Sequence, residues 1–131
     1  MIVVDSSAIV AIALEEAEAD VFYKILEITP SVIAAPTLLE THMVLAKYSE
    51  RLGANFLSVF VKNREMQVEP FDANLSLIAR DAFDRYGKGR HPAKLNFGDC
   101  ISYALAKSRD LPLLFKGDDF PLTDIRPAYR A

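Results

Sequence analysis

Cysteine, tryptophan and long apolar runs are scarce in this chain, and their scarcity excludes several protein classes. The 131 residues include one cysteine, Cys100, and no tryptophan, so an internal disulfide framework of the kind found in small secreted domains is excluded. Cys100 falls in an apolar helical pattern, which predicts a buried, inert thiol and a reducing compartment. The longest apolar run, Ala8 to Leu14, is far shorter than the roughly 20 residues of a membrane helix.

Motifs for several common chemistries are missing as well. The two histidines, His42 and His91, are not spaced as a pair of zinc ligands. There is no Gly-x-Gly-x-x-Gly or phosphate-binding P-loop, and no Gly-x-Ser-x-Gly hydrolase elbow. The net charge of −3 argues against indiscriminate binding of nucleic acid through overall charge. With no basic leader and no membrane span, we expect a soluble, cytoplasmic protein that does not associate with a membrane.

The residues that are present suffice for one ordinary domain. Hydrophobic residues make up 51% of the chain, which predicts a single domain over residues 1–131. Short apolar runs alternate with helical patterns, and this alternation predicts an α/β fold with a short parallel sheet flanked by helices. The expected strands are 2–4, 32–34, 66–68 and 113–115, with a short final strand at Ile125, and the expected helices are 6–14, 16–28, 36–52 (closed by Gly53 as a left-handed cap), 55–62, 72–86 and 96–109.

Four acidic residues stand near predicted helix starts, and three of them follow a predicted strand. They are Asp5, Glu40, Asp99 and Asp118. Because the carboxyl ends of parallel strands meet at one edge of a sheet, we expect these carboxylates to share a cleft. Carboxylates crowded together repel one another unless a hard cation lies between them, so the pattern predicts a site for Mg²⁺ or Mn²⁺.

Each acid also has a purely structural explanation. Asp5 could cap the first helix, and Asp99 suits the positive end of a helix. Thr37 and Glu40 have the spacing of a capping box. Gly117-Asp118-Asp119 has the composition of a turn, and Asp119 competes with Asp118 for the fourth acidic position. Capping does not, however, require four acids at the same edge of one sheet.

A cluster of positive charge precedes the helix that carries Asp99. An extended loop is expected from Tyr86 to Leu95, and Tyr86 or Phe97 could stack on a base. Such a loop beside a metal cleft is suited to the phosphates of a nucleic acid, although a merely solvated loop would have the same composition. The cations are Arg85, Lys88, Arg90 and Lys94.

These motifs together resemble those of one known family. The order and spacing are similar to the PIN-domain endoribonucleases, and more narrowly to the VapC toxins of prokaryotic type II toxin–antitoxin systems. The resemblance spans nearly the whole chain and implies a PIN-like three-layer sandwich. It is carried by Val3-Val4-Asp5-Ser6-Ser7-Ala8, Ala35-Pro36-Thr37-Leu38-Leu39-Glu40, Leu95-Asn96-Phe97-Gly98-Asp99-Cys100 and Leu113-Leu114-Phe115-Lys116-Gly117-Asp118-Asp119-Phe120.

The resemblance implies roles for individual residues. Asp5, Glu40 and Asp99 correspond to metal-site acids, with Asp118 as the fourth (Asp119 as alternate) and Ser7 as a polar companion of the first. It further implies Mg²⁺-dependent hydrolysis of RNA, a VapB-type antitoxin as partner, and a homodimer. The chain departs from the family at Lys116, where a threonine or serine is common.

The residues leave two other functions open. A metal-dependent phosphatase or a DNA nuclease could use the same carboxylates, because a metal–carboxylate site does not by itself select RNA. A non-catalytic interaction module could retain the acids only as helix caps.

Overall fold

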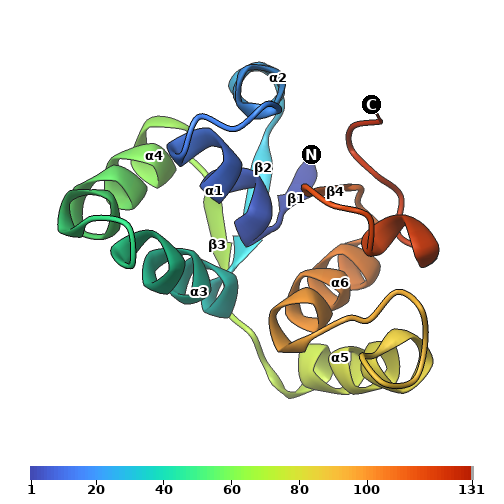
Figure 1. Cartoon of the computed structure of the whole chain (residues 1–131). Helices are drawn as coiled ribbons and strands as arrows, with labels where there is room; N and C mark the ends of the chain where they lie inside the picture. Colours follow the sequence, from blue (N-terminus) through green and yellow to red (C-terminus); the bar gives the residue numbers. More distant parts are fainter. Residues whose placement is uncertain (131) are drawn as a thin grey trace.

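The computed structural model describes residues 1–130 and is built around a short parallel sheet (Figure 1). Its strands lie in the order β3-β2-β1-β4, and all three pairings are parallel. Residue 131, the last of the expected domain, lies outside the described residues. The strands are β1 (Ile2–Val4), β2 (Ser31–Ala34), β3 (Gln67–Glu69) and β4 (Leu113–Leu114).

Helices cover both faces of the sheet. α1 to α4 lie on one side and α5 and α6 on the other (Figure 1). The helices are α1 (Ser6–Ala13), α2 (Ala19–Ile28), α3 (Ala35–Ala46), α4 (Leu57–Asn63), α5 (Ala73–Tyr86) and α6 (Phe97–Arg109). The expected three-layer α/β sandwich with a central parallel sheet is therefore confirmed.

Alternation along the strands divides the core into two clusters. Val3 and Leu113 pack with residues of α6, whereas Val4 and Leu114 pack with residues of α1 to α4. Successive side chains of a strand point to opposite faces, so a strand that is buried on both faces contributes apolar side chains to both core clusters. This explains why β1, β2 and β4 are apolar or buried at every position.

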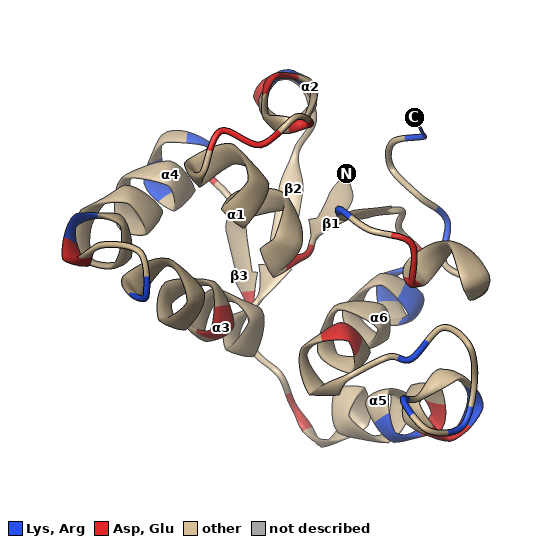
Figure 2. Cartoon of the chain, viewed as in Figure 1, with Lys and Arg blue, Asp and Glu red and all other residues tan. Residues whose placement is uncertain are grey.

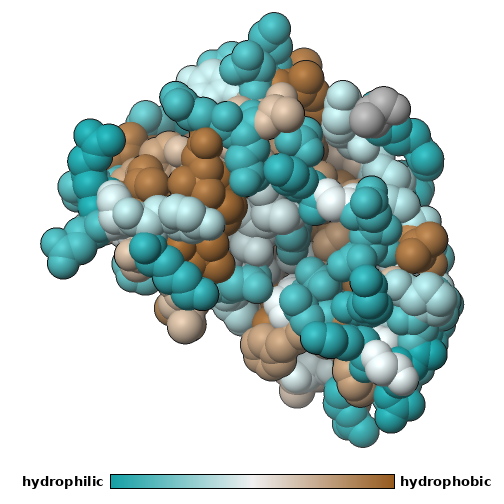
Figure 3. All heavy atoms as spheres, in the orientation of Figure 1, coloured by the Kyte–Doolittle hydropathy of each residue, from teal (hydrophilic) through white to brown (hydrophobic). Residues whose placement is uncertain are grey.

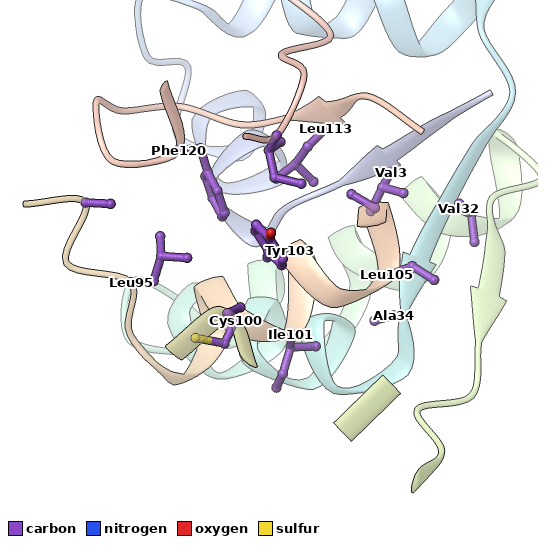
Figure 4. Packing of buried hydrophobic residues seen from close by; sticks show 14 residues of the cluster. Val3, Val32, Ala34, Leu95, Cys100, Ile101, Tyr103, Leu105, Leu113 and Phe120 are labelled. Carbon is purple, nitrogen blue, oxygen red and sulfur yellow. The ribbon is translucent and has the colours of Figure 1, made fainter. Parts of the chain in front are cut away.

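The cluster between the sheet and α6 has a large aromatic centre. Tyr103 and Phe120 lie among the aliphatic residues of this layer, close to Leu113 (Figure 4). Cys100 belongs to the same cluster, and burial raises the pKa of its thiol to about 11. The expectation of a buried, unreactive cysteine is confirmed, because a thiol with so high a pKa carries little thiolate at neutral pH.

The expected helix 36–52 is wrong at its end, because α3 stops at Ala46. A π-helical turn follows over Leu52–Phe56, so Gly53 is not a left-handed cap. Gly53 lies against Ala46, and the Nδ1 atom of His42 bonds the Gly53 carbonyl at 2.7 Å. This side-chain bond and the close approach that glycine permits hold the widened turn against α3.

Two other boundaries also differ. The second helix begins at Ala19 instead of residue 16, since a turn joins it to α1. Ile125 is buried but is not in a strand. Only a single bridge joins Leu113 to Pro127 there, and because proline has no N–H, a longer ladder at this edge is disfavoured. Within residues 1–130, no helix is both long enough and apolar enough to cross a membrane.

Candidate active site

The carboxyl ends of the strands bring three of the expected acids together. Asp5 follows β1 directly, Glu40 lies on the helix that follows β2, and Asp99 lies in the first turn of α6. Figure 2 shows acidic positions on α3 and on α6 on either side of this end of β1. Asp5 and Glu40 both contribute to the pKa of Asp99, so the three carboxylates act on one another electrostatically.

Asp5 is buried and held by three hydrogen bonds. It is the N-cap of α1, and its Oδ2 atom accepts from the Ser7 backbone N–H at 3.1 Å and from the Ser7 hydroxyl at 2.6 Å. Its Oδ1 atom accepts from the hydroxyl of Ser102 at 2.6 Å. The Asp5 side chain therefore caps α1 and also lies at the sheet edge near the other acids. Ser102 was not expected here, because its contact with Asp5 joins residues 97 positions apart and leaves no local signal in the sequence.

Glu40 does not cap its helix. α3 begins at Ala35, which places Thr37 inside the helix with a buried hydroxyl that has no hydrogen-bond partner among the described residues. The capping-box explanation for Glu40 is therefore wrong. Burial raises the pKa of Glu40, the Ser6 side chain partly offsets this increase, and the charge of Asp5 adds to it. Within residues 1–130, the Oε1 atom of Glu40 is buried without a hydrogen-bond partner.

Gly98 makes room for the Glu40 carboxylate. A methyl group placed on the Gly98 Cα would lie 2.7 Å from both Cδ and Oε1 of Glu40, well inside the van der Waals distance. The carboxylate thus lies directly against the backbone at the amino end of α6. Partial positive charge at a helix amino terminus favours a carboxylate there, and Gly98 is the residue that allows the approach.

Asp99 combines a capping role with an unfavourable electrostatic position. Its Oδ2 atom accepts from the Asn96 N–H at 3.1 Å, and its own N–H donates to the Asn96 side chain at 2.9 Å, which completes a capping box. Burial nevertheless raises the pKa of Asp99 to about 6, and the charges of Asp5, Asp119 and Glu40 contribute, while the bond from Asn96 opposes the increase.

The fourth acidic position lies in the segment after β4. The charge of Asp119 contributes to the raised pKa of Asp99. Asp118 lines a separate cavity of about 460 Å³ together with Glu18 and Lys116. Asp119 therefore lies within electrostatic reach of Asp99, and the choice between Asp118 and Asp119 as the fourth acid stays a prediction.

The backbone N–H of Lys116 contacts Ser7 at the site, whereas its side chain pairs with acids outside the site. The Lys116 N–H donates to the Ser7 hydroxyl at 3.0 Å, and that hydroxyl donates to Asp5. The ammonium group pairs with Glu16 at 3.1 Å and with Glu18 at 3.6 Å. Although Lys116 departs from the family pattern, the Ser7 hydroxyl still accepts from the backbone N–H at this position and donates to Asp5.

Known proteins with similar sequences identify the family of this chain. The family model described as PIN domain matches residues 2–125. The chain belongs to the PIN-domain family. Ribonuclease VapC42 of Mycobacterium tuberculosis is 42% identical over 128 residues, which cover 96% of this chain and 98% of that protein. The ribonuclease VapC of Mycolicibacterium smegmatis is 40% identical over 124 residues, which cover 94% of this chain and 96% of that protein. Within the family, this chain therefore groups with the VapC ribonucleases.

A solved structure supports the fold of this PIN domain independently. The crystal structure of VapC20 of Mycobacterium tuberculosis, described as a Sarcin-Ricin loop cleaving toxin, superposes with a TM-score of 0.75. The alignment covers 97% of this chain and all of that chain at 20% sequence identity. A similarity at this level of identity establishes the PIN fold alone.

The acids of this PIN domain fit a hard divalent ion in chemistry. VapC ribonucleases generally depend on a metal ion. Within residues 1–130, no group of three or more His, Cys, Asp or Glu residues is placed so that it could hold a metal ion. The unpartnered Oε1 of Glu40 and the raised pKa values of Glu40 and Asp99 nevertheless indicate charge that lacks compensation. Oxygen donors of this kind suit Mg²⁺ or Mn²⁺.

The basic loop of the PIN domain is only partly available. Arg85 pairs with Asp81 at 3.6 Å and Asp124 at 3.8 Å. Lys88, Arg90 and Lys94 are exposed and form no ion pair within residues 1–130. Figure 2 shows basic positions along the segment between α5 and α6. Three of the four predicted cations therefore have no ion pair within residues 1–130, whereas Arg85 is held by Asp81 and Asp124.

Mg²⁺ should stabilise this PIN domain more at pH 7.5 than at pH 5. Because the folded-state pKa of Asp99 is raised to about 6 from 3.8, the metal-free protein loses stability as the pH rises through this interval. A divalent ion bound by these carboxylates would compete with protons for them. At a Mg²⁺ concentration ten times the dissociation constant, bound Mg²⁺ should raise the melting temperature of the protein by about 5 °C at pH 7.5.

Thermal melts of the wild type and of Asp99→Asn, with and without Mg²⁺, measure this effect. The variant should show a weaker fall in metal-free stability between pH 4 and pH 6, since it lacks the titrating group. Equal Mg²⁺ stabilisation at pH 5 and pH 7.5 would contradict the prediction.

Proposed function

We propose that this protein is a Mg²⁺-dependent endoribonuclease that hydrolyses RNA phosphodiester bonds and acts as the toxin of a VapBC-type toxin–antitoxin pair in the cytoplasm. Residues 1–131 form one PIN domain in this proposal. The observation that carries it is the meeting of Asp5, Glu40 and Asp99 at one sheet edge, where burial and the charge of Asp5 raise the pKa values of Glu40 and Asp99. An enzyme keeps such a costly arrangement when a cation offsets the repulsion.

The acids have distinct roles in the proposed reaction. A bound Mg²⁺ supplies activation of a water and stabilisation of charge on the attacked phosphate. Asp5 and Asp99 hold the ion. Glu40, with its unpartnered Oε1, and Asp119 or Asp118 complete the coordination or orient the water. Ser7 keeps Asp5 in place from one side, because it donates two hydrogen bonds to the same carboxylate oxygen.

Substrate contacts are assigned to the loop before α6. Lys88, Arg90 and Lys94 bind phosphates of the RNA. Arg85 also binds phosphate in this proposal while it stays paired with Asp81 and Asp124. Phe97, the first residue of α6, is 84% exposed and provides a ring on which a base stacks.

Two protein partners belong to the proposal. The antitoxin is of the VapB type, and a structure described as a toxin–antitoxin complex from Klebsiella pneumoniae shares the fold with a TM-score of 0.68 at 18% identity, covering 92% of this chain and 90% of that chain. An apolar groove of about 370 Å³ between α1, α2 and α4 supports a partner segment, and Figure 3 shows hydrophobic surface over this part of the molecule. Leu39 and Met43 of α3 are about 60% exposed, which supports a homodimer.

Substrate profiling tests the proposed activity. The purified protein should cleave single-stranded RNA with Mg²⁺ or Mn²⁺ and lose this activity with a chelator. DNA of the same sequence and a small aryl phosphate should be much poorer substrates. Preferential turnover of DNA or of the phosphate ester would favour another phosphohydrolase. No turnover of any of them, together with no metal-dependent stabilisation, would favour an interaction module.

A further inference from the structure

Ser102 is a buried serine whose hydroxyl reaches across the sheet edge to Asp5. It lies on α6, is 1% exposed, and donates to the Oδ1 atom of Asp5 at 2.6 Å, although the two residues are 97 positions apart in the chain. A serine inside a helix commonly bonds a carbonyl of its own preceding turn. The single proton of this hydroxyl points to a carboxylate of another element instead.

The hydrogen bonds to Asp5 divide unequally between its two oxygens. Oδ2 accepts both bonds from Ser7, whereas Oδ1 accepts only the bond from Ser102. An ionised carboxylate has about four acceptor positions, so Oδ1 retains one. Two bonds on one oxygen and one on the other fix the rotation of the carboxylate, and this rotation decides where the remaining acceptor position of Oδ1 points.

Ser102 also connects two of the acids mechanically. It follows Asp99 by three residues, which places the two side chains one helical turn apart on α6. Asp99 is itself fixed at the start of this helix by the capping box with Asn96. The Ser102 bond therefore attaches Asp5, at the end of β1, to the rigid turn that presents Asp99.

We propose that Ser102 is a positioning residue that sets the orientation of Asp5 relative to Asp99 and so prepares the two carboxylates for a divalent ion. This role rests on the proposed metal-dependent function. Residues behind the direct ligands typically change metal affinity by about 10- to 100-fold when they are removed. Ser102 does not touch the substrate, so its effect is on metal binding first.

Ser31 provides a matched control. It is also a buried serine, it lies at the start of β2 beside Ile2, away from the end of β1 that carries Asp5, and its hydroxyl has no hydrogen-bond partner within residues 1–130. Replacing it by alanine removes the same atom from a buried position. It leaves the bond from Ser102 to Asp5 untouched.

Mn²⁺ binding without RNA, followed by electron paramagnetic resonance of the free ion, measures the effect. Ser102→Ala should weaken Mn²⁺ binding by about 10-fold or more, and Ser31→Ala should match the wild type. Ser102→Cys keeps the shape of the side chain but is a weak donor. It should also bind Mn²⁺ more weakly than the wild type, and it serves as the test if the alanine variant does not fold.

The outcomes separate this proposal from the one on which it rests. Wild-type affinity in a folded Ser102 variant, while the wild-type protein binds Mn²⁺ and cleaves RNA, would overturn the role of Ser102 alone. An equal loss in Ser31→Ala would assign the effect to general core packing and would also overturn it. Failure of the wild-type protein to bind Mn²⁺ would overturn the metal site itself.

Discussion

Replacement of Asp5 by asparagine should reduce Mg²⁺-dependent RNA cleavage by at least about 100-fold, because a direct ligand should matter at least as much as residues behind the ligands. The fold should survive. Asparagine caps helices about as well as aspartate, and its amide oxygen can still accept from the Ser7 N–H that now bonds Asp5. Loss of the negative charge also relieves repulsion with Glu40 and Asp99, so the metal-free variant should melt at or above the wild-type temperature.

Asp124→Asn is the matched control for this experiment. Asp124 accepts from the Tyr103 hydroxyl at 2.7 Å and from Lys107 at 2.6 Å, and these partners together with Arg85 lower its pKa. Its replacement should cost stability above the unfolded-state pKa of the carboxyl and leave metal-dependent cleavage of the folded protein unchanged. Full activity in Asp5→Asn, or equal losses of activity in both folded variants, would remove Asp5 from the catalytic machinery.

Gly98→Ala should remove most of the activity without lowering stability. The added methyl group would collide with the carboxylate of Glu40, which is the mobile end of its side chain and is expected to move away. Alanine in a helix is favoured over glycine by about 0.5–1 kcal/mol, so the melting temperature should hold or rise. Cleavage should fall by about 10-fold or more, because Glu40 no longer lies beside Asp5 and Asp99.

A double-mutant cycle with Glu40→Gln isolates this mechanism. If Gly98→Ala acts through Glu40, it should have little further effect on cleavage once Glu40 has been replaced. Additive losses in the double variant would show that Gly98 acts on something else, such as RNA passing over the start of α6. Retained activity in the single variant would show that Glu40 need not occupy its present place.

The sheet and its covering helices were predictable because burial on both faces leaves strong local patterns. β1 and β2 are short apolar runs, and the Asp72 and Asn96 caps mark the starts of α5 and α6. The end of α3 was not predictable by the same means. The bond between His42 and the Gly53 carbonyl, which accompanies the π-helical turn, joins residues 11 positions apart, and no local propensity reports it.

The acids of the proposed site can be picked out in the sequence, whereas the residues that contact them cannot. Helix capping and metal binding favour the same residue types at the same positions, as Asp5 and Asp99 demonstrate by capping their helices. Sequence alone therefore could not separate the two roles. Ser102 and Gly98 contact residues that lie 97 and 58 positions away along the chain, and such contacts exist only after the sheet has assembled.

Anomalous diffraction from crystals of the wild-type protein soaked in Mn²⁺ tests most directly whether these carboxylates jointly bind a divalent ion. A Mn²⁺ peak bounded by Asp5 and Asp99, with Glu40 turned toward it directly or through a water, is the expected result. Absence of a peak there, at a Mn²⁺ concentration at which the same protein cleaves RNA, would contradict the proposed site.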